Sequence, residues 1–157
     1  MTGRKIELNQ AITRFTLPAS GALTWKLQDR VGRNLVLYFY PRDNTSGCTQ
    51  EGSDFRDLYA SFAKAGTEIV GISPDSVASH DKFVKKMQFP FLLLSDVERT
   101  VCKLFDVIKE KSLYGKKYVG VERSTFLIDS KGILRAEWRK VKVKGHAQEV
   151  LAAAQSL

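Results

Sequence analysis

Residues 34–40, NLVLYFY, contain an unbroken run of apolar and aromatic side chains from Leu35 to Tyr40. A run of this length and composition predicts a strand that is buried on both faces. A second segment, TEIVGIS at residues 67–73, has a shorter apolar centre, IVGI, and we expect it to be another buried strand. Strands buried on both faces belong to sheets that are covered by helices, so these two segments direct the chain toward an α/β architecture.

The segment between these two strands has a helical pattern. Phe55, Leu58, Tyr59 and Phe62 are spaced i, i+3, i+4 and i+7, which places them on one face of an amphipathic helix. Gly66 follows the last of them, and glycine commonly ends a helix. We therefore expect a helix that packs this apolar face on the sheet and stops before residue 67.

The remaining elements alternate in the same way. We expect an amino-terminal hairpin in FTLPASGALTWKL, a helix over 76–87, a strand in FPFLLLS, a short helix in VERTVCKLFDV, a hairpin from RSTFLID and ILRAEWR, and a closing helix over 146–156. Asp75 or Ser76 would cap the helix over 76–87. The inward-facing residues of the two middle helices are expected to be Val77, Phe83, Val84 and Met87, and Val97, Val101, Leu104 and Phe105.

This order of elements predicts an α/β sandwich with a central mixed sheet flanked by helices, and the thioredoxin-like arrangement fits it. The 157 residues contain no repeat, low-complexity tract or linker, so we expect a single domain over residues 1–157. The longest apolar runs are far shorter than a bilayer requires, and the first thirty residues hold no such run. We expect a cytoplasmic protein.

The net charge of +8 allows an anionic partner such as nucleic acid, but the basic residues are scattered. In one small cluster, Lys140, Lys142 and Lys144 alternate with Val141 and Val143. Alternation with period two is typical of a strand with one solvated face. We favour that interpretation over a nucleic-acid surface.

A metal site is not expected, because the four cysteine and histidine residues are not closely paired as metal ligands usually are: Cys48, Cys102, His80 and His146. We place His80 on the exposed side or flank of its helix. His146 follows a glycine at a helix start, which suggests a structural or solvent-facing role.

Cys48 differs from a packing cysteine. It follows the buried strand 34–40 through a loop of turn-forming residues, and it opens the amphipathic helix. The N-terminus of a helix presents unpaired N–H groups and partial positive charge, which favour a thiolate over a thiol. The thiolate is the reactive form of cysteine. We therefore predict that Cys48 is a nucleophile, with Glu51 in the first helical turn as a partner of the helix dipole.

The stretch from Pro41 to Cys48 has the spacing P-x-x-x-T-x-x-C, which resembles the active-site motif of the peroxiredoxins. The segments LYFYPRDNTSGCTQEGSDFRD, GISPDS, LLSD, YGKKYVGVERSTFLID and VKVKGHAQEVL extend the resemblance over most of the chain. They are similar to the bacterioferritin-comigratory-protein branch, also called peroxiredoxin Q.

The resemblance implies a role for each motif residue. Cys48 would be the peroxidatic cysteine that attacks the O–O bond and becomes a sulfenic acid. Thr45 would form hydrogen bonds to the peroxide and to the sulfur through its hydroxyl. Arg123 would place its guanidinium in contact with the sulfur and with the oxygens of the substrate. Pro41 would shield the pocket and shape the loop. No cofactor is implied.

The same resemblance exposes a departure. Many members of the branch carry a resolving cysteine where this chain has Ser53, and others carry one where it has Val84. The sequence does not distinguish a natural serine from an introduced one. Cys102 is either a small buried hydrophobe, which we favour, or a resolving thiol that would need fortunate placement.

We therefore expect recycling by an external thiol, from thioredoxin, glutaredoxin or glutathione. Hydrogen peroxide and organic hydroperoxides are the expected substrates, and a monomer is favoured over a stable oligomer. The alternative is a thiol–disulfide oxidoreductase of the same fold without peroxidase activity. That class normally uses a C-x-x-C pair, which is absent after Cys48.

Overall fold

The computed structural model describes residues 6–30 and 32–157. The strands are β1 (Thr16–Ala19), β2 (Leu23–Lys26), β3 (Asn34–Phe39), β4 (Thr67–Ser73), β5 (Leu92–Ser95), β6 (Ile108–Leu113), β7 (Lys116–Val121), β8 (Ser124–Ile128) and β9 (Leu134–Trp138). The α-helices are α1 (Ser46–Asp57), α2 (Tyr59–Lys64), α3 (Val77–Met87), α4 (Thr100–Leu104) and α5 (His146–Gln155), and a short 3₁₀ helix spans Leu27–Arg30. Among these elements, no helix has the length and apolar character needed to cross a membrane.

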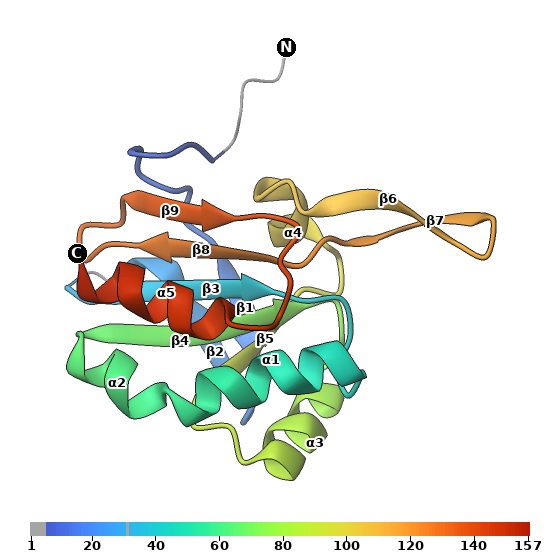
Figure 1. Ribbon diagram of the computed structural model, residues 1–157, viewed down its shortest axis with the longest axis horizontal. Helices are drawn as coiled ribbons and strands as arrows, with labels where there is room; N and C mark the ends of the chain where they lie inside the picture. Colours follow the sequence, from blue (N-terminus) through green and yellow to red (C-terminus); the bar gives the residue numbers. More distant parts are fainter. Residues whose placement is uncertain (1–5, 31) are drawn as a thin grey trace.

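Seven of the described strands form one mixed sheet in the order β2-β1-β5-β4-β3-β8-β9 (Figure 1). The central strands β3, β4 and β5 are parallel, while β1, β8 and β9 pair antiparallel with their neighbours. The predicted hairpins appear as β1–β2 and β8–β9. Helices lie on both sides of the sheet, which confirms the predicted α/β sandwich with a mixed central sheet.

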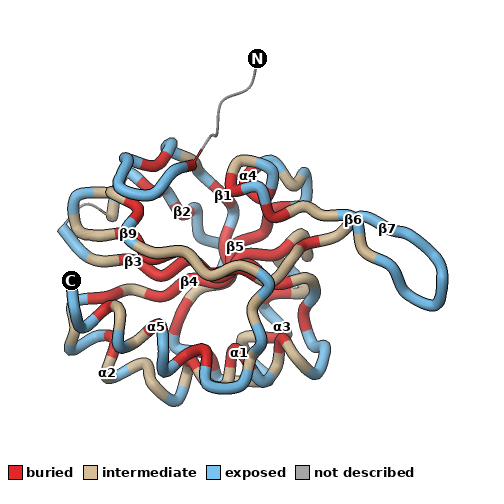
Figure 2. Tube along the Cα trace, turned by 45° about the horizontal axis from the view of Figure 1, so that its top comes forward, coloured by how far each residue is buried: buried red, intermediate tan, exposed pale blue. Residues whose placement is uncertain are grey.

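Each face of the sheet has its own apolar core, because successive side chains of a strand point to opposite faces. In β3, Leu35, Leu37 and Phe39 join the core that also contains residues of α4, whereas Val36 and Tyr38 join the core under α1, α2, α3 and α5. The strands β3, β4 and β8 are buried over almost their whole length (Figure 2). The predicted burial of residues 34–40 and 67–73 on both faces is therefore confirmed.

The helix predicted after Cys48 is present but broken. Leu58 separates α1 from α2, and the apolar face continues across the break with Phe55 and Phe62 both fully buried. Gly66 follows with φ +65°, a left-handed conformation that suits glycine at a helix end. Ser76 caps α3, since its hydroxyl accepts a hydrogen bond from the Ser79 N–H at 3.1 Å.

Two local predictions are wrong. Val97 is 59% exposed rather than buried, because α4 begins only at Thr100 and the preceding residues form a turn. Residues 140–144 are not a strand; they form a loop in which Lys140, Lys142 and Lys144 are exposed and the two valines are half-buried. Exposed lysines do alternate with half-buried valines here, but an extended loop that packs on the protein shows the same alternation as a strand.

Candidate active site

Cys48 is the third residue of α1, and Thr45 is the N-cap residue of that helix. The loop that precedes α1 begins where β3 ends, at the centre of the sheet, so a rigid strand positions the cysteine. The thiol is only 2% exposed and contacts the core under α1, α2, α3 and α5. Cys48 thus lies in the first turn of a helix, as predicted, and the N–H groups of such a turn are unpaired and carry partial positive charge.

Arg123 meets Cys48 from a distant part of the chain. It lies between β7 and β8, 75 positions later, and its Nη2 donates to Cys48 Sγ at 3.4 Å. Its Nη1 donates to Glu51 Oε1 at 2.6 Å, and the arginine side chain is 16% exposed. The Glu51 carboxylate therefore holds the guanidinium through Nη1, and this places Nη2 against the sulfur.

Gly47 makes room for this contact. A Cβ atom at residue 47 would lie 3.1 Å from Nη2 of Arg123, which is tighter than ordinary packing. Because the arginine is fixed by both Glu51 and Cys48, it has little freedom to retreat. The absence of a side chain at Gly47 lets the guanidinium approach the sulfur.

Glu51 is the main active-site residue that the sequence did not assign. It lies in the second turn of α1, not the first, and is 1% exposed, so its predicted role as a dipole partner is wrong. Burial raises its pKa to about 7, while the charge and hydrogen bond of Arg123 act in the opposite direction. The carboxylate is only half satisfied, since its buried Oε2 has no hydrogen-bond partner. Its spacing of i+3 from Cys48 on one helix face was the available signal.

His146 is the second buried group with a strongly shifted pKa. It is 5% exposed, its Nε2 lies 2.7 Å from the Thr125 hydroxyl, and its ring meets Phe55 edge-on. Burial lowers the pKa of His146 to about 4, with the charge of Glu149 opposing the shift. The structural role predicted for His146 is confirmed, and it does not face solvent.

These two groups have opposite effects on stability as pH changes. The folded protein keeps the Glu51 proton up to a pH of about 7, against 4.5 for an ordinary glutamate, so this residue makes the free energy of unfolding fall as pH rises through that window. His146 binds its proton more tightly in the unfolded chain, so stability on its account is lost as pH falls from 6.5 to about 4.

The two contributions therefore nearly cancel between pH 4.5 and 6.5 in the unmodified protein. Glu51→Gln removes the contribution of Glu51, so the pH dependence due to His146 should become visible. We expect the free energy of unfolding of the variant to rise by up to about 3 kcal/mol relative to that of the unmodified protein as pH rises from 4.5 to 7. Urea unfolding at several pH values measures this difference. A difference between the two proteins that does not change with pH would contradict the assignment.

Thr45 and Pro41 lie in the same loop as predicted, but their proposed contacts to substrate are not tested by the structure. The Thr45 side chain is exposed, and its hydroxyl donates to the Arg42 carbonyl at 3.0 Å. Pro41 is half-buried at the start of the loop, immediately after the buried Tyr40. Their roles toward peroxide stay predictions.

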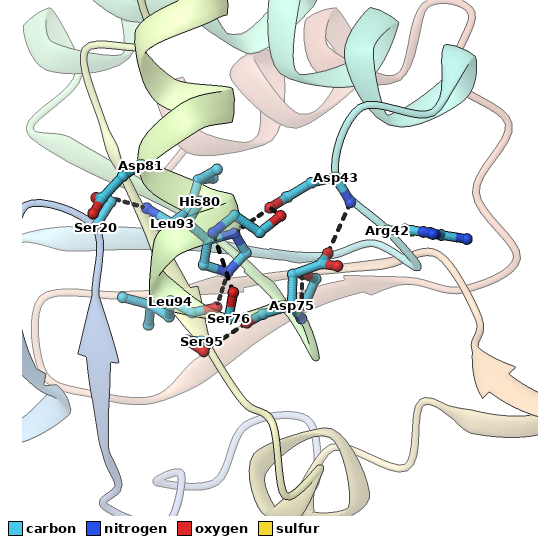
Figure 3. A network of polar contacts seen from close by, with 12 residues as sticks. Ser20, Arg42, Asp43, Asp75, Ser76, His80, Asp81, Leu93, Leu94 and Ser95 are labelled. Atoms are coloured by element: carbon cyan, nitrogen blue, oxygen red, sulfur yellow. Dashed lines mark hydrogen bonds and ion pairs between the residues drawn. The ribbon is translucent and has the colours of Figure 1, made fainter.

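A buried polar network holds this loop against the rest of the fold (Figure 3). Asp43 accepts hydrogen bonds from the hydroxyls of Tyr40 and Ser79 at 2.6 and 2.7 Å, and its Oδ2 lies 2.7 Å from Nδ1 of His80. The backbone N–H of Asp43 donates to Asp75 at 2.8 Å. The loop is thereby fastened to Tyr40, which directly follows β3, to α3 and to the segment that follows β4.

His80 was placed on an exposed helix face, and this prediction is wrong. Its ring is fully buried between Asp43 and the backbone carbonyl of Leu94, which lies 2.9 Å from Nε2. A carbonyl oxygen can only accept, so Nε2 donates; with an ionised Asp43, Nδ1 donates as well. Burial acts to raise the pKa of Asp43, but the hydrogen bonds from His80, Tyr40 and Ser79 outweigh it and lower that pKa. His80 and Asp43 thus form a buried histidine–carboxylate hydrogen bond.

Asp43, Asp75 and His80 bring their potential ligand atoms within 4.8 Å of one another, which is close enough to consider a metal. Each group already has protein partners: Ser73 and the Asp43 N–H donate to Asp75, and both ring nitrogens of His80 are engaged. This cluster therefore behaves as a hydrogen-bond network that positions the loop.

Cys102 lies on the other side of the sheet from Cys48. It belongs to the core that contains α4, it is fully buried, and its backbone N–H donates to Asp96 at 2.7 Å. Burial raises the pKa of its thiol far above the ordinary value, and the charge of Asp96 adds to this. The favoured interpretation of Cys102 as a buried hydrophobe agrees with this position, and the sheet stands between the two sulfurs.

Residues 8–137 match the model of the AhpC/TSA family, and the chain belongs to this family. It is 51% identical to Peroxiredoxin Bcp of Xanthomonas campestris over 153 residues, which cover 98% of this chain and 96% of that protein. It is also 51% identical to Peroxiredoxin Bcp of Bacillus subtilis over 146 residues, with 93% of each protein covered.

Solved structures agree with these relatives. A structure of Xylella fastidiosa PrxQ superposes with a TM-score of 0.92 at 42% identity, covering 98% of each chain. A second structure, of the Xanthomonas campestris bacterioferritin comigratory protein, gives a TM-score of 0.86 at 51% identity and covers 90% of each chain; that work concerns the alkyl peroxide reduction activity of that protein. The predicted thioredoxin-like arrangement and the resemblance to the peroxiredoxin Q branch are both confirmed.

Proposed function

We propose that this chain is a thiol peroxidase that reduces hydrogen peroxide and organic hydroperoxides through Cys48. The observation that carries the proposal is the contact between Arg123 Nη2 and Cys48 Sγ at the N-terminus of α1. A fixed cation and a helix N-terminus at the same sulfur favour the thiolate, which is the nucleophile. The names of the relatives support peroxide chemistry rather than thiol–disulfide exchange without peroxidase activity.

The reaction proceeds by displacement at oxygen. The Cys48 thiolate attacks one peroxide oxygen, an S–O bond forms, the O–O bond breaks, and the departing oxygen carries away the electron pair. That oxygen takes up the proton of the peroxide and leaves as water or an alcohol, while Cys48 is oxidised to a sulfenate. The sulfenate takes up a proton from solvent, which replaces the one that the thiol lost, and becomes the sulfenic acid. Negative charge moves from sulfur to oxygen during this step, so the Arg123 guanidinium stabilises it throughout.

Thr45 and Pro41 complete the proposed catalytic set. Thr45 is the N-cap residue three positions before Cys48, so a rotation of its hydroxyl away from the Arg42 carbonyl offers the peroxide a donor. Pro41 fixes the backbone at the start of the loop and has no N–H that needs a partner there. Glu51 acts through Arg123, which it orients, and is therefore a positioning residue.

Recycling requires a thiol from outside the chain. Cys102 is on the opposite face of the sheet, and a disulfide needs Cα atoms within about 7 Å. The reductant thiol condenses with the Cys48 sulfenic acid, releasing water and forming a mixed disulfide, which a second thiol then reduces. Thioredoxin, glutaredoxin or glutathione are the donors we propose. Because Cys48 is 2% exposed, the first turn of α1 must open for this thiol to reach the sulfur.

We further propose a single domain over residues 1–157 that acts in the cytoplasm as a monomer. The family match over residues 8–137 and one sheet that joins strands from Thr16 to Trp138 support the single domain. Light scattering tests the proposed monomer.

Steady-state peroxide consumption tests the proposed function. The protein, Cys48→Ser and Cys102→Ser are compared with thioredoxin-based and glutathione-based recycling. We expect Cys48→Ser to lose turnover with every donor and Cys102→Ser to keep it, because only one sulfur faces Arg123. Turnover that survives in Cys48→Ser, or disappears in Cys102→Ser without loss of fold, would overturn the proposal.

A further inference from the structure

The hairpin of β6 and β7 was not predicted, and it projects past the ends of the strands of the main sheet (Figure 1). Most of its length is exposed (Figure 2). Its outer part nevertheless carries large apolar side chains in water: Leu113 is 55% exposed, Tyr114 96%, Tyr118 47% and Val119 56%. A concentration of exposed apolar side chains on one projecting element is typical of a surface that meets a partner.

The strand register divides the hairpin into two faces. Lys111 pairs with Tyr118, Leu113 with Lys116, and Lys109 with Gly120. Paired residues share a face, and residues two apart along a strand share it too. The near face therefore consists of Lys109, Lys111, Leu113, Lys116, Tyr118 and Gly120. The far face consists of Ile108, Glu110, Ser112, Lys117, Val119 and Val121.

The near face is the one directed toward the active site. At the base of the hairpin, the far-face residues Ile108 and Val121 pack into the core that contains α4, on the opposite side of the sheet from Cys48. Lys111, on the near face, is half-buried and within electrostatic reach of the site: burial lowers its pKa, Arg123 lowers it further, and Cys48 opposes both. The chain passes from β7 directly to Arg123.

The two faces differ in charge. On the far face, Glu110 pairs with Lys117 at 3.7 Å. The near face has three lysines and no acidic residue, and Lys109 alone among them has an ion-pair partner, Asp106, at 3.2 Å. The near face is therefore apolar and positive, which matches an occupant with an apolar and acidic surface.

The tip of the hairpin gives an independent indication. Tyr114 and Gly115 form its turn with φ of +52° and +79°. Both central positions of such a turn favour asparagine or glycine, so the backbone conformation does not explain the tyrosine at residue 114. A strained residue whose ring is almost fully in water suggests a ring that is used in contact.

We propose that the near face and Tyr114 dock an acidic dithiol protein of the thioredoxin class when it reduces the Cys48 sulfenic acid. This inference rests on the proposed function. Six residues of strand extend about 20 Å, a length that a protein surface covers and a tripeptide thiol does not. A second copy of this chain is a poor occupant, because each copy carries a net charge of +8. The docked protein supplies both thiols: one forms the mixed disulfide and releases water, and the other releases Cys48 as a thiol.

Matched pairs of substitutions test the proposal. Leu113→Ser with Lys116→Glu alters the near face, and Val119→Ser with Lys117→Glu alters the far face. The two pairs change charge equally, and Leu113 and Val119 are 55% and 56% exposed. Each protein is oxidised with one equivalent of hydrogen peroxide and then reduced, either by a bacterial thioredoxin with its reductase or by dithiothreitol.

We expect kcat/KM for thioredoxin to fall at least about tenfold in the near-face variant and less than about twofold in the far-face variant. Added salt should weaken the thioredoxin reaction of the unmodified protein more than that of the near-face variant. Oxidation by peroxide and reduction by dithiothreitol should be unchanged in both variants.

Equal effects of the two pairs, an equal loss with dithiothreitol, or no reduction by thioredoxin in any variant would overturn the docking surface. Failure of peroxide to oxidise Cys48 would appear before any reductant is added, and it would instead refute the proposed function. The two failures are therefore distinguishable.

Discussion

Arg123→Ala is expected to slow the oxidation of Cys48 by peroxide by about 100- to 1000-fold, the usual effect of removing one preorganised donor from a developing negative charge. The arginine is the only described cation in hydrogen-bond contact with Cys48 Sγ, and both prongs of its guanidinium are engaged. Stopped-flow measurement of the oxidation step gives the rate constant directly.

The fold should tolerate this substitution. Glu51 would lose its partner, but its pKa is already about 7, so taking up a proton near neutral pH costs little. Arg123→Lys should recover only part of the rate, because an ammonium does not bridge Glu51 and the sulfur as a fork does. Arg135→Ala serves as the control. Arg135 lies on β9 and pairs with Asp129, so this variant should be oxidised at the normal rate. Parallel losses of thermal stability and rate in Arg123→Ala would contradict a catalytic role.

His80→Ala should destabilise the protein by about 2–6 kcal/mol, because two buried acceptors, the Asp43 carboxylate and the Leu94 carbonyl, would each lose a hydrogen-bond partner. The Asp43 side chain is only 4% exposed, so water does not readily replace the lost hydrogen bond. Because Asp43 anchors the loop before α1, the oxidation of Cys48 should slow as well. Urea denaturation measures the first effect, and the peroxide reaction measures the second.

Ser79→Ala provides the comparison for His80. It removes one hydrogen bond to the same carboxylate oxygen but leaves His80 in place, so the expected loss is about 1 kcal/mol. The double variant Asp43→Ala with His80→Ala should lose less than the sum of the two single variants, because the pair acts as a unit. Equal losses of stability for His80→Ala and Ser79→Ala would show that the contact between His80 and Asp43 contributes no more to the free energy of unfolding than one ordinary hydrogen bond.

The sequence predicted the parts of the fold that follow from strong local patterns. Residues 34–40 and 67–73 became buried parallel strands because their apolar runs have no alternative that buries both faces. The β6–β7 hairpin was missed because its polar and apolar residues do not alternate regularly and its turn is Tyr114–Gly115 rather than a typical turn pair. Little in such a segment distinguishes a projecting hairpin from a loop.

The site residues that belong to one sequence motif could be predicted. Residues whose surroundings depend on contacts with distant parts of the chain could not. Cys48 was predicted from its place after a buried strand, and its contact with Arg123 came from the family resemblance. His80 was misplaced because a histidine usually lies outside the core, although its spacing of i+3 from Val77 and from Phe83 puts it on the inward stripe of α3. Its partner Asp43 is 37 positions away, a pairing that no local pattern encodes.

The central claim is that peroxide reacts at Cys48 and not at Cys102. Treating the protein with one equivalent of hydrogen peroxide in the presence of a sulfenic-acid trap, followed by peptide mass spectrometry, tests this directly. We predict that the trap labels Cys48 alone, since that sulfur faces Arg123 while Cys102 is buried on the other side of the sheet with its pKa raised. Labelling of Cys102 at a comparable rate, or no labelling of Cys48, would contradict the account.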